Sequence, residues 1–362
     1  MTVNEKYMFR CLQLAKKGEG FTKPNPMVGA VIVHNNNIIG EGFHRQYGKP
    51  HAEVNAIASV KDPSLLSEST LYVSCDWSSD VCSSDLHYGK TPPCAELIIS
   101  KQIPRVVIAS TDPNPTVAGK GTELLRNAGI EVSCGILEKE GKELNRMFFV
   151  NQLLNRPYII LKWAQSKDGF IDFERQDSVV NQPAKISNII TQCFVHKERT
   201  LVQGIMVGTN TVIKDNPLLT ARKWCGNHPV RITLDRNGRI PRESKIFNDD
   251  APTIVFTEKE DYNIKKKSVT IVTLDFSNDV NLNILSYLYK HKIYSLMIEG
   301  GTFLLNSFIE RDLWDEAYVE VSDIEFNSGI KAPSLNWQSG ISKRYSNSLQ
   351  YHLKNKITQN FL

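Results

Sequence analysis

The chain has 362 residues, of which 41% are hydrophobic and 23% charged, and its formal net charge at pH 7 is +4. That length is enough for two or three ordinary domains, and the composition is typical of a soluble globular protein. The charge is too weak to indicate a nucleic-acid-binding surface, and the longest apolar runs, MVGAVIV and YIILKWA, are far shorter than the roughly 20 residues of a membrane span. We therefore expect neither a nucleic-acid nor a membrane partner.

The N-terminus and the cysteines both indicate a cytoplasmic protein. Residues 1–20 lack the apolar core of a signal peptide and predict an amphipathic helix over 4–17. The seven cysteines are odd in number and scattered, which argues against a disulfide framework. In a reducing compartment, clustered cysteines are candidate metal ligands, whereas we expect the isolated ones to fill small core or surface positions, namely Cys11, Cys134, Cys193 and Cys225.

Strands and helices alternate over the first 135 residues. Two strands, 28–33 and 38–42, are joined by an Asn-rich turn at 35–37. Further helices are predicted over 51–60, 94–103 and 120–129, and further strands over 69–74, 105–110 and 130–135. This alternation predicts an α/β layer structure with a mainly parallel sheet.

A second α/β series follows a connector at about 148–156. Its segments are YIILKWAQSKDG, GIMVGTNTVI, VRITLD, TIVFTE, SVTIVTL, YSLMIEGGTFLLNSFIE and AYVEVS. We therefore predict two domains, 1–148 and 156–362.

Two predicted helices in the first domain begin with residues that can bind metal. His51 and Glu53 open one helix, and Cys94 opens another. Helix N-termini direct N–H groups and a positive dipole end outward, which suits a thiolate ligand and a polarised water. The pattern H-x-E followed by P-C-x(n)-C is typical of zinc deaminases, in which one His and two Cys hold Zn²⁺ and the Glu moves protons. The sequence thus predicts a zinc site with His51 and Cys94 as ligands and Glu53 as the catalytic residue.

Residues 7–148 resemble the deaminase domain of the bifunctional riboflavin-biosynthesis deaminase/reductase family. The segments TKPNPMVGAVIV, IIGEGFHRQYGKPHAEVNAI, HYGKTPPCAELI and STDPNPTVAGKG carry the resemblance. Nucleoside and tRNA deaminases share H-A-E but not HYGKTPPC or DPNP. The resemblance implies a cytidine-deaminase-like fold and a small pyrimidine ribose-phosphate substrate, which would be held by Asn25, His44, Lys90, Thr91, Asp112 and Asn114.

Residues 75–86 interrupt this resemblance. The family reads V-T-L-E-P-C-S-H-Y-G-K-T-P-P-C here. Val73 and Ser74 match its start, and the residues from His87 to Cys94 match its end. The twelve residues from Cys75 to Leu86 replace L-E-P-C-S, so the second cysteine ligand is missing from its expected place.

Three interpretations of this insert remain open. In the first, Cys82 or Cys75 completes the zinc site, although metal ligands must be placed to within a few tenths of an ångström. In the second, Asp85 does so, since carboxylates also bind Zn²⁺. In the third, the segment is a sequencing artifact, because DWSSDVCSSDL is similar to one frame of a common library adapter ending TGC-TCT-TCC-GAT-CT, which encodes Cys-Ser-Ser-Asp-Leu. Among the residues of the printed chain we take Cys82 as the candidate third ligand.

Residues 156–340 resemble the reductase half of the same family, which is related in shape to dihydrofolate reductase. The segments ILKWAQSKDGFI, IMVGTNTVIKDNPLLTAR, PVRITLDRNGRIP and LMIEGGTFLLNSFIERDLWDE carry the match. No G-x-G-x-x-G follows the first strand, whereas the paired glycines of EGGT precede a helix that would stabilise a phosphate. The resemblance implies NADPH contacts from Ala164, Thr211, Asp215, Gly301, Thr302, Phe303, Leu304, Leu305, Asn306 and Ser307, and substrate contacts from Arg199, Leu219, Arg222 and Glu299.

One residue departs from the pattern of this half. Family members usually have W-I-T or a close variant ahead of the Arg-bearing helix, with the Trp close to the cofactor. PAKISN places Lys185 there, which alters the expected packing against the nicotinamide. We find no side chain that must be the proton donor of the reduction.

The two halves together predict a bifunctional enzyme of riboflavin biosynthesis that uses one Zn²⁺ and NADPH and forms a homo-oligomer. A deaminase step on a diamino-hydroxy-pyrimidine ribosylamine phosphate would precede reduction of the ribose. One alternative is a reductase alone, with a first domain that lacks zinc. Another is a single-stranded nucleic-acid deaminase, against which the small net charge argues.

Overall fold

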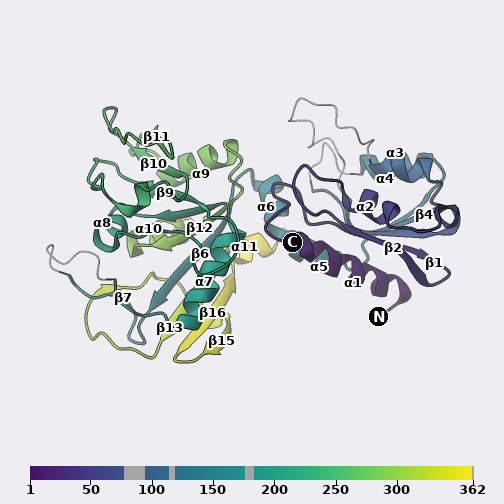
Figure 1. Cartoon of the computed structure of the whole chain (residues 1–362). Coiled ribbons are helices and arrows are strands. Elements are labelled where there is room, and N and C mark those ends of the chain that lie inside the picture. The colour runs from purple at the N-terminus through teal and green to yellow at the C-terminus, as the bar shows by residue number, and fades with distance from the viewer. Residues whose placement is uncertain (77–93, 114–118, 176–182, 361–362) are drawn as a thin grey trace. The chain divides into compact units, whose positions relative to one another are not determined.

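The computed structural model describes residues 1–76, 94–113, 119–175 and 183–360. The chain divides into two compact units, Met1–Leu154 and a second that begins at Asn155, and Figure 1 colours the first from purple to teal and the second from teal to yellow. No helix of the described residues is both long enough and apolar enough to cross a membrane.

The segment expected to be a connector at 148–156 is mostly helical. Helix α6 (Arg146–Leu154) buries Phe148, Phe149 and Val150. Aromatic side chains bury large apolar areas, and the rings of Phe148 and Phe149 also contact each other at a centroid distance of 6.0 Å, so apolar burial stabilises this helix. The helix ends just before Asn155, whose φ of 51° lies in the left-handed region.

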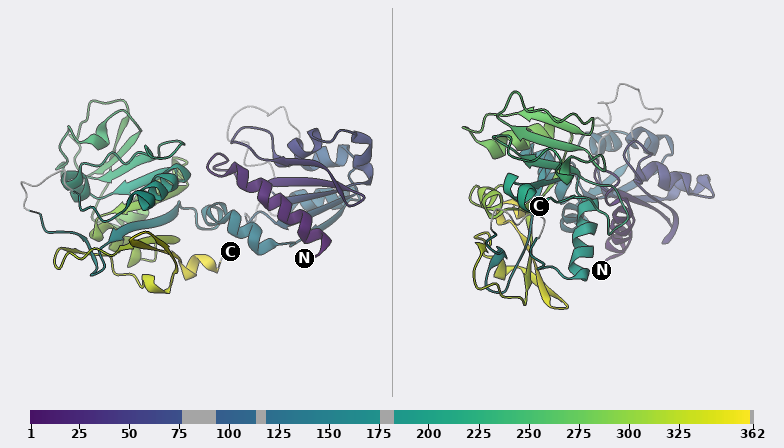
Figure 2. Two further views of the ribbon diagram at one scale, coloured as in Figure 1. Left: turned by 60° about the horizontal axis from the view of Figure 1, so that its bottom comes forward. Right: turned by 60° about the vertical axis from the view of Figure 1, so that its left-hand side comes forward.

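The first unit is a five-stranded sheet with helices on both faces (Figures 1 and 2). The strand order is β2-β1-β3-β4-β5. Its strands are β1 (Gly29–His34), β2 (Asn37–Phe43), β3 (Thr70–Cys75), β4 (Arg105–Ser110) and β5 (Glu131–Cys134). Its helices, besides α6, are α1 (Val3–Ala15), α2 (Ala52–Ala58), α3 (Cys94–Ser100), α4 (Lys120–Asn127) and α5 (Glu138–Leu144).

Two apolar clusters hold these layers together. On one face, Ala52 and Ala56 of α2, Ile98 of α3 and Leu125 of α4 pack against the sheet. On the other face, α1 contributes Tyr7, Met8, Cys11 and Leu14. The helices that carry His51 and Cys94 therefore lie on the same side of the sheet.

The prediction of a mainly parallel sheet is wrong for half of this sheet. β3, β4 and β5 run parallel, whereas β1 pairs antiparallel with both β2 and β3. The reason lies in the Asn-rich turn, where Asn35 and Asn36 have φ values of 47° and 62°. A two-residue loop with positive φ at both positions reverses the chain into a hairpin, so β2 cannot run parallel to β1.

The second unit is built on a nine-stranded sheet of order β11-β10-β9-β8-β12-β6-β13-β16-β15, with a small β14-β7 pair beside it. Among the described residues, the antiparallel pairs of the large sheet are those of β16 with β13 and with β15. The strands of the two sheets are β6 (Tyr158–Gln165), β7 (Phe170–Asp172), β8 (Gly204–Val207), β9 (Val230–Leu234), β10 (Thr253–Thr257), β11 (Val269–Thr273), β12 (Ser295–Gly300), β13 (Glu316–Ser322), β14 (Ile330–Lys331), β15 (Ile341–Tyr345) and β16 (Ser348–Lys354).

Helices cover both faces of this large sheet. They are α7 (Ile189–Leu201), α8 (Thr209–Asp215), α9 (Val280–Lys290), α10 (Thr302–Ile309) and the short α11 (Lys356–Gln359). α9 and α10 pack into one core cluster through Ile284, Leu288 and Phe308. α8 contributes Val212 to a separate cluster that includes Phe247. β6, β8 and β12 run parallel, so their carboxyl ends, where α8 and α10 begin, meet at one edge of the sheet.

Candidate active sites

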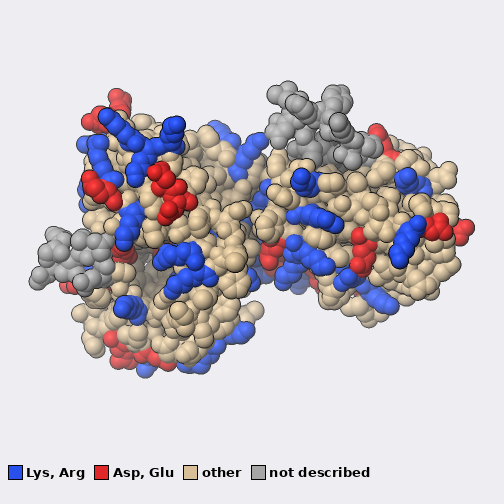
Figure 3. All heavy atoms as spheres, viewed as in Figure 1, with Lys and Arg blue, Asp and Glu red and all other residues tan. Residues whose placement is uncertain are grey.

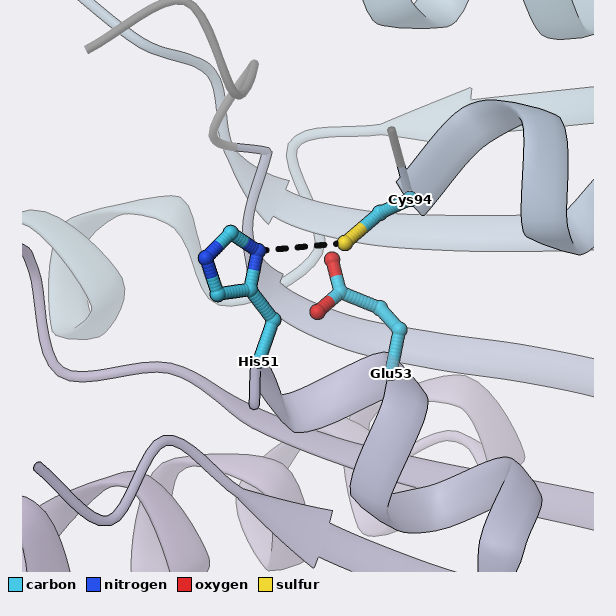
Figure 4. Close-up of side chains that lie close together, drawn as sticks. All are labelled: His51, Glu53 and Cys94. Atoms are coloured by element: carbon cyan, nitrogen blue, oxygen red, sulfur yellow. Dashed lines mark hydrogen bonds between the residues drawn. The ribbon is translucent and has the colours of Figure 1, made fainter. Parts of the chain in front are cut away.

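The first candidate site lies where α2 and α3 begin. One ligand atom from each of His51, Glu53 and Cys94 lies within 4.8 Å of the others, and Nδ1 of His51 is 3.2 Å from Sγ of Cys94 (Figure 4). His51 is the N-cap of α2, with an extended backbone, and Cys94 is the first residue of α3. The three residues predicted from H-A-E and P-P-C thus converge, although Cys94 comes 41 positions after Glu53 in the sequence.

Burial sets the charges of this cluster. Burial raises the pKa of Glu53 to about 7, and the nearby charge of Asp76 adds to this effect. Burial lowers the pKa of His51 to about 4, with repulsion from His44 as the second cause. The imidazole is therefore neutral at physiological pH, which is the form that binds a metal.

Two of the predicted substrate residues adjoin His51. The His44 ring meets the His51 ring edge-on at a centroid distance of 5.5 Å. Nε2 of His44 lies 3.2 Å from Nδ2 of Asn25, and its Nδ1 lies 3.3 Å from the Pro50 carbonyl oxygen. Asp112 is also buried. The pKa of Asp76 is raised to about 6, first by the burial of Asp76 and second by the charge of Asp112. Lys90, Thr91 and Asn114 lie outside the described residues.

The donor set fits zinc, but the described residues supply only part of it. An imidazole nitrogen and a thiol sulfur are typical zinc donors, and a catalytic zinc usually has three protein ligands. Cys75 is not brought into the cluster, because it ends β3 fully buried in the apolar core, where burial raises the pKa of its thiol. Cys82 and Asp85 lie outside the described residues.

The second candidate site is a cavity of about 1220 Å³ in the second unit. Lys and Arg side chains surround a hollow on the face of this unit shown in Figure 3. The cavity is lined by the predicted residues Ala164, Thr211, Asp215, Arg222, Glu299, Gly301, Thr302, Phe303, Leu304, Leu305 and Ser307.

The β12–α10 junction forms part of the cavity wall and fits a dinucleotide. Gly301 has a φ of 73°, and a Cβ there would lie 3.3 Å from Oγ1 of Thr211. Glycine therefore lets the backbone approach a bound group closely, and the N-terminus of α10 follows directly. Phe303, 90% exposed on the same wall, offers an uncovered aromatic ring.

Three predicted residues of this half do not line the cavity. Arg199 lies behind Glu299, to which its Nε and Nη2 donate hydrogen bonds of 2.8 and 2.6 Å, while Nη1 donates to the Thr220 carbonyl oxygen. Leu219 is buried in a core cluster with Val212. The side chain of Asn306 accepts a hydrogen bond from the backbone N–H of Ser334.

Several residues at the cavity escaped sequence reasoning. Lys162 lines it, and its charge is among the causes that lower the pKa of Glu299, after the opposing effect of burial and the stronger effect of Arg199. Its position as a charged residue inside the apolar run YIILKWA could have indicated a functional role from the sequence. Arg175 also lines the cavity, and no local pattern marks it. Lys185, at the position expected for Trp, lies on the wall as an exposed cation.

Comparison with known proteins gives the family. Residues 1–110 match the cytidine and deoxycytidylate deaminase zinc-binding region, and residues 157–322 match the RibD C-terminal domain. The riboflavin biosynthesis protein RibD of Aquifex aeolicus is 40% identical over 343 residues, which are 93% of this chain and 92% of that protein. The chain belongs to the RibD family. RibD of Escherichia coli is 32% identical over 335 residues, covering 88% of this chain and 87% of its own.

Solved structures agree with this assignment. A diaminohydroxyphosphoribosylaminopyrimidine deaminase/5-amino-6-(5-phosphoribosylamino)uracil reductase from Thermotoga maritima is 35% identical, with a TM-score of 0.84 over 97% of this chain and 98% of its own. RibD from Acinetobacter baumannii is 31% identical, with a TM-score of 0.81 over the same shares of both chains. The expected fold class is confirmed, with a cytidine-deaminase-like domain followed by a dihydrofolate-reductase-like domain. The expected bifunctional deaminase/reductase of riboflavin biosynthesis is also confirmed.

Proposed function

We propose that the first unit hydrolytically deaminates 2,5-diamino-6-ribosylamino-4(3H)-pyrimidinone 5′-phosphate. The second unit then reduces the ribosyl side chain of the product to ribityl with NADPH. The observation that carries the deaminase step is the convergence of His51, Glu53 and Cys94 within 4.8 Å. Family membership over most of the chain supports the presence of both activities on one chain.

In the first unit, His51 and Cys94 would hold Zn²⁺ with a third ligand from the segment 77–93, for which Cys82 is the candidate in the printed sequence. When bound, Zn²⁺ makes hydroxide available near neutral pH. Glu53 accepts the proton of a water placed at the amino-bearing ring carbon and returns a proton to the departing ammonia. Its burial beside the cluster keeps competing water away from this transfer.

The pyrimidine and its ribose-phosphate would lie against Asn25, His44, Lys90, Thr91, Asp112 and Asn114. The contacts of His51 with His44 and of His44 with Asn25 support this placement, because they put polar groups beside the cluster of His51, Glu53 and Cys94. Lys90 would meet the phosphate as a point charge.

In the second unit, NADPH would bind along Ala164, Thr211, Asp215 and the stretch from Gly301 to Ser307, and it supplies the hydride. The substrate would contact Arg222 and Glu299 on the cavity wall, whereas the expected contacts Leu219 and Arg199 lie behind that wall and would support it. Arg222 is exposed and lines the cavity, which leaves its guanidinium open to a phosphate. Arg199 supports the same site by pairing with Glu299, so its role is to fix that carboxylate as well as to add positive charge.

The deaminase step is tested by Glu53→Gln, with Glu123→Gln on the exposed face of α4 as the matched control. Loss of a general acid–base residue costs about 10²- to 10⁴-fold in rate. We expect ammonia release to fall by that factor in Glu53→Gln only, while bound zinc and NADPH oxidation on the deaminated intermediate stay unchanged. Ammonia release at the wild-type rate in Glu53→Gln would contradict the role of Glu53, whereas no release from the wild type or either variant would support a reductase with an inactive first unit.

Two measurements test the third zinc ligand: the genomic DNA sequence of this segment and the zinc content of a variant. Genomic DNA across codons 70–95 that encodes L-E-P-C-S would assign the ligand to that cysteine. If the printed segment is genomic, Cys82→Ser is expected to lower bound zinc, and unchanged zinc would exclude Cys82.

The expected cytoplasmic location and homo-oligomeric state belong to this proposal as well. All cysteines of the described residues are free, which supports a reducing compartment. Sizing of the purified protein by light scattering tests the oligomer, and a mass equal to one chain would contradict it.

A further inference from the structure

Arg175 is a buried cation on the wall of the reductase cavity. Its side chain is 1% exposed, and its guanidinium carbon lies 5.4 Å from the centroid of the Phe173 ring. Nη2 lies 2.5 Å from Oδ2 of Asp172 and 2.8 Å from Oδ1 of Asp215, and Nη1 donates a hydrogen bond of 3.2 Å to the Lys214 carbonyl oxygen. One guanidinium therefore joins the end of β7 to the last turn of α8.

The two oxygens of Asp215 have different surroundings. Oδ1 is buried and lies 2.8 Å from Nη2 of Arg175 in an ion pair that lacks hydrogen-bond geometry. Oδ2 receives no hydrogen bond from the described residues, and the Asp215 side chain keeps 28% of its surface exposed on the cavity wall. One side of the carboxylate is thus fixed, and the other is open to a donor from a bound molecule.

We propose that Arg175 is a positioning residue of the reductase, which holds Asp215 in place as a hydrogen-bond acceptor for a hydroxyl or amide N–H of NADPH. This inference rests on the proposed function of the second unit. Arg175 itself does not reach the cofactor, because its donors are engaged by Asp172, Asp215 and Lys214. It acts through the direction and charge of the Asp215 carboxylate.

The charges around Asp215 support this role. Burial raises the pKa of Asp215, whereas the ion pair with Arg175 lowers it again. Asp172 adds a smaller upward effect and Lys214 a smaller downward one. Without Arg175 the carboxyl would keep the effect of burial and of Asp172, so its pKa would rise further. It would then take up a proton at a higher pH than in the wild type and would lose part of its strength as an acceptor.

The test is the binding of NADPH to the full chain, followed by cofactor fluorescence. Arg175→Gln is expected to weaken NADPH binding about tenfold, the usual scale for one hydrogen bond to a charged group. The loss is expected to shrink as the pH rises, because Asp215 ionises again. Arg175→Lys keeps the charge with fewer contacts and is expected to lie between wild type and Arg175→Gln. Arg344→Gln removes an exposed arginine away from the cavity and is the matched control.

A double-mutant cycle separates positioning from general loss of structure. Asp215→Asn is expected to weaken NADPH binding, and Arg175→Gln in that background is expected to add less than a twofold further loss. Independent effects of the two changes would multiply, and that result would overturn the inference. So would NADPH binding in Arg175→Gln equal to wild type.

Two further outcomes are decided in advance. If Arg175→Gln does not fold, the Arg175→Lys variant decides, and binding equal to wild type at every pH overturns the inference. If wild-type protein does not bind NADPH at all, that result contradicts the proposed function of the second unit, and therefore also the role of Arg175 that rests on it.

Discussion

At the scale of single residues, the first site depends on two helix starts that place one nitrogen and one sulfur donor side by side. His51 precedes α2 and Cys94 opens α3, and Nδ1 and Sγ lie 3.2 Å apart. The thiolate that metal binding requires is favoured at such a position, because the N-terminal end of a helix carries positive partial charge. Glu53 lies in the first turn of α2, two residues after His51, and this brings its carboxylate close to the nitrogen and sulfur donors.

Removal of the sulfur donor should release the metal. Loss of groups that merely orient metal ligands costs about 10- to 100-fold in affinity, so Cys94→Ala is expected to cost at least about 100-fold. Cys134→Ala, which changes an exposed cysteine in β5 of the same unit, is the control and should retain zinc. Metal analysis after dialysis against a weak chelator measures both, and wild-type zinc content in Cys94→Ala would contradict the assignment.

The buried pair of Arg199 and Glu299 makes a prediction about stability and pH. Burial raises the pKa of Glu299, but the charge and hydrogen bonds of Arg199 outweigh it and hold the pKa below its usual value. A lowered pKa in the folded protein means that the ionised carboxylate stabilises the fold above the unfolded pKa of about 4.3. That contribution is lost as the pH falls through the folded pKa.

Arg199→Ala would leave this carboxylate buried without its partner, at a cost of about 3 kcal/mol or more near pH 7. Without Arg199 the pKa of Glu299 rises, so the protonated form relieves the cost at acid pH, and the difference from wild type should shrink toward pH 4.5. Calorimetric melting at both pH values measures it. Arg236→Ala, which breaks an exposed pair with Glu258, should lower the melting temperature little. A destabilisation that does not change with pH would contradict the account.

At the scale of elements, Asp315 ties three parts of the second unit together. It accepts hydrogen bonds of 2.7 Å from both terminal nitrogens of Arg156, 2.7 Å from the Ile159 N–H and 2.6 Å from the Thr358 hydroxyl. The start of β6, the start of β13 and helix α11 therefore share one fully buried carboxylate. Helix α11 has only four residues, and the hydrogen bond from Thr358 to Asp315 fixes it against the second unit.

Asp315→Ala is expected to destabilise the second unit by about 3–5 kcal/mol, since a buried cation and two further donors would lose their acceptor. Asp323→Ala, which removes an exposed partner of Arg344, is the control and should cost less than about 1 kcal/mol. Scanning calorimetry of the full chain measures both. Equal melting of the two variants would show that Asp315 does not anchor these elements.

The elements of both sites were predictable where a short local pattern determines them. The helix starts at His51 and Cys94 and the strand–glycine–helix order around Gly301 are confirmed. The Asn-rich turn predicted the β1–β2 hairpin, but the antiparallel pairing of β1 with β3 was not predictable, because alternation of helices and strands does not reveal which strands become neighbours in the sheet. Arg175 was not either, because its partner Asp215 lies 40 positions away and nothing local connects them.

At the scale of the whole molecule, one chain carries two chemically different sites, each within its own unit. Unit one offers nitrogen, sulfur and carboxylate groups at converging helix starts, and unit two offers a wide cavity with a glycine-rich wall and several cations. The family match extends over both units, so the two activities belong together.

The most direct test of this account is a stoichiometric assay on the full chain supplied with zinc, NADPH and the diaminopyrimidine ribosylamine phosphate. Ammonia and NADPH consumption are measured in the same reaction. The account predicts one ammonia released and one NADPH oxidised per substrate, with ammonia appearing first and both lost when a chelator removes the metal beforehand. Oxidation of NADPH on supplied deaminated intermediate, with no ammonia from the diaminopyrimidine at any zinc concentration, would contradict it.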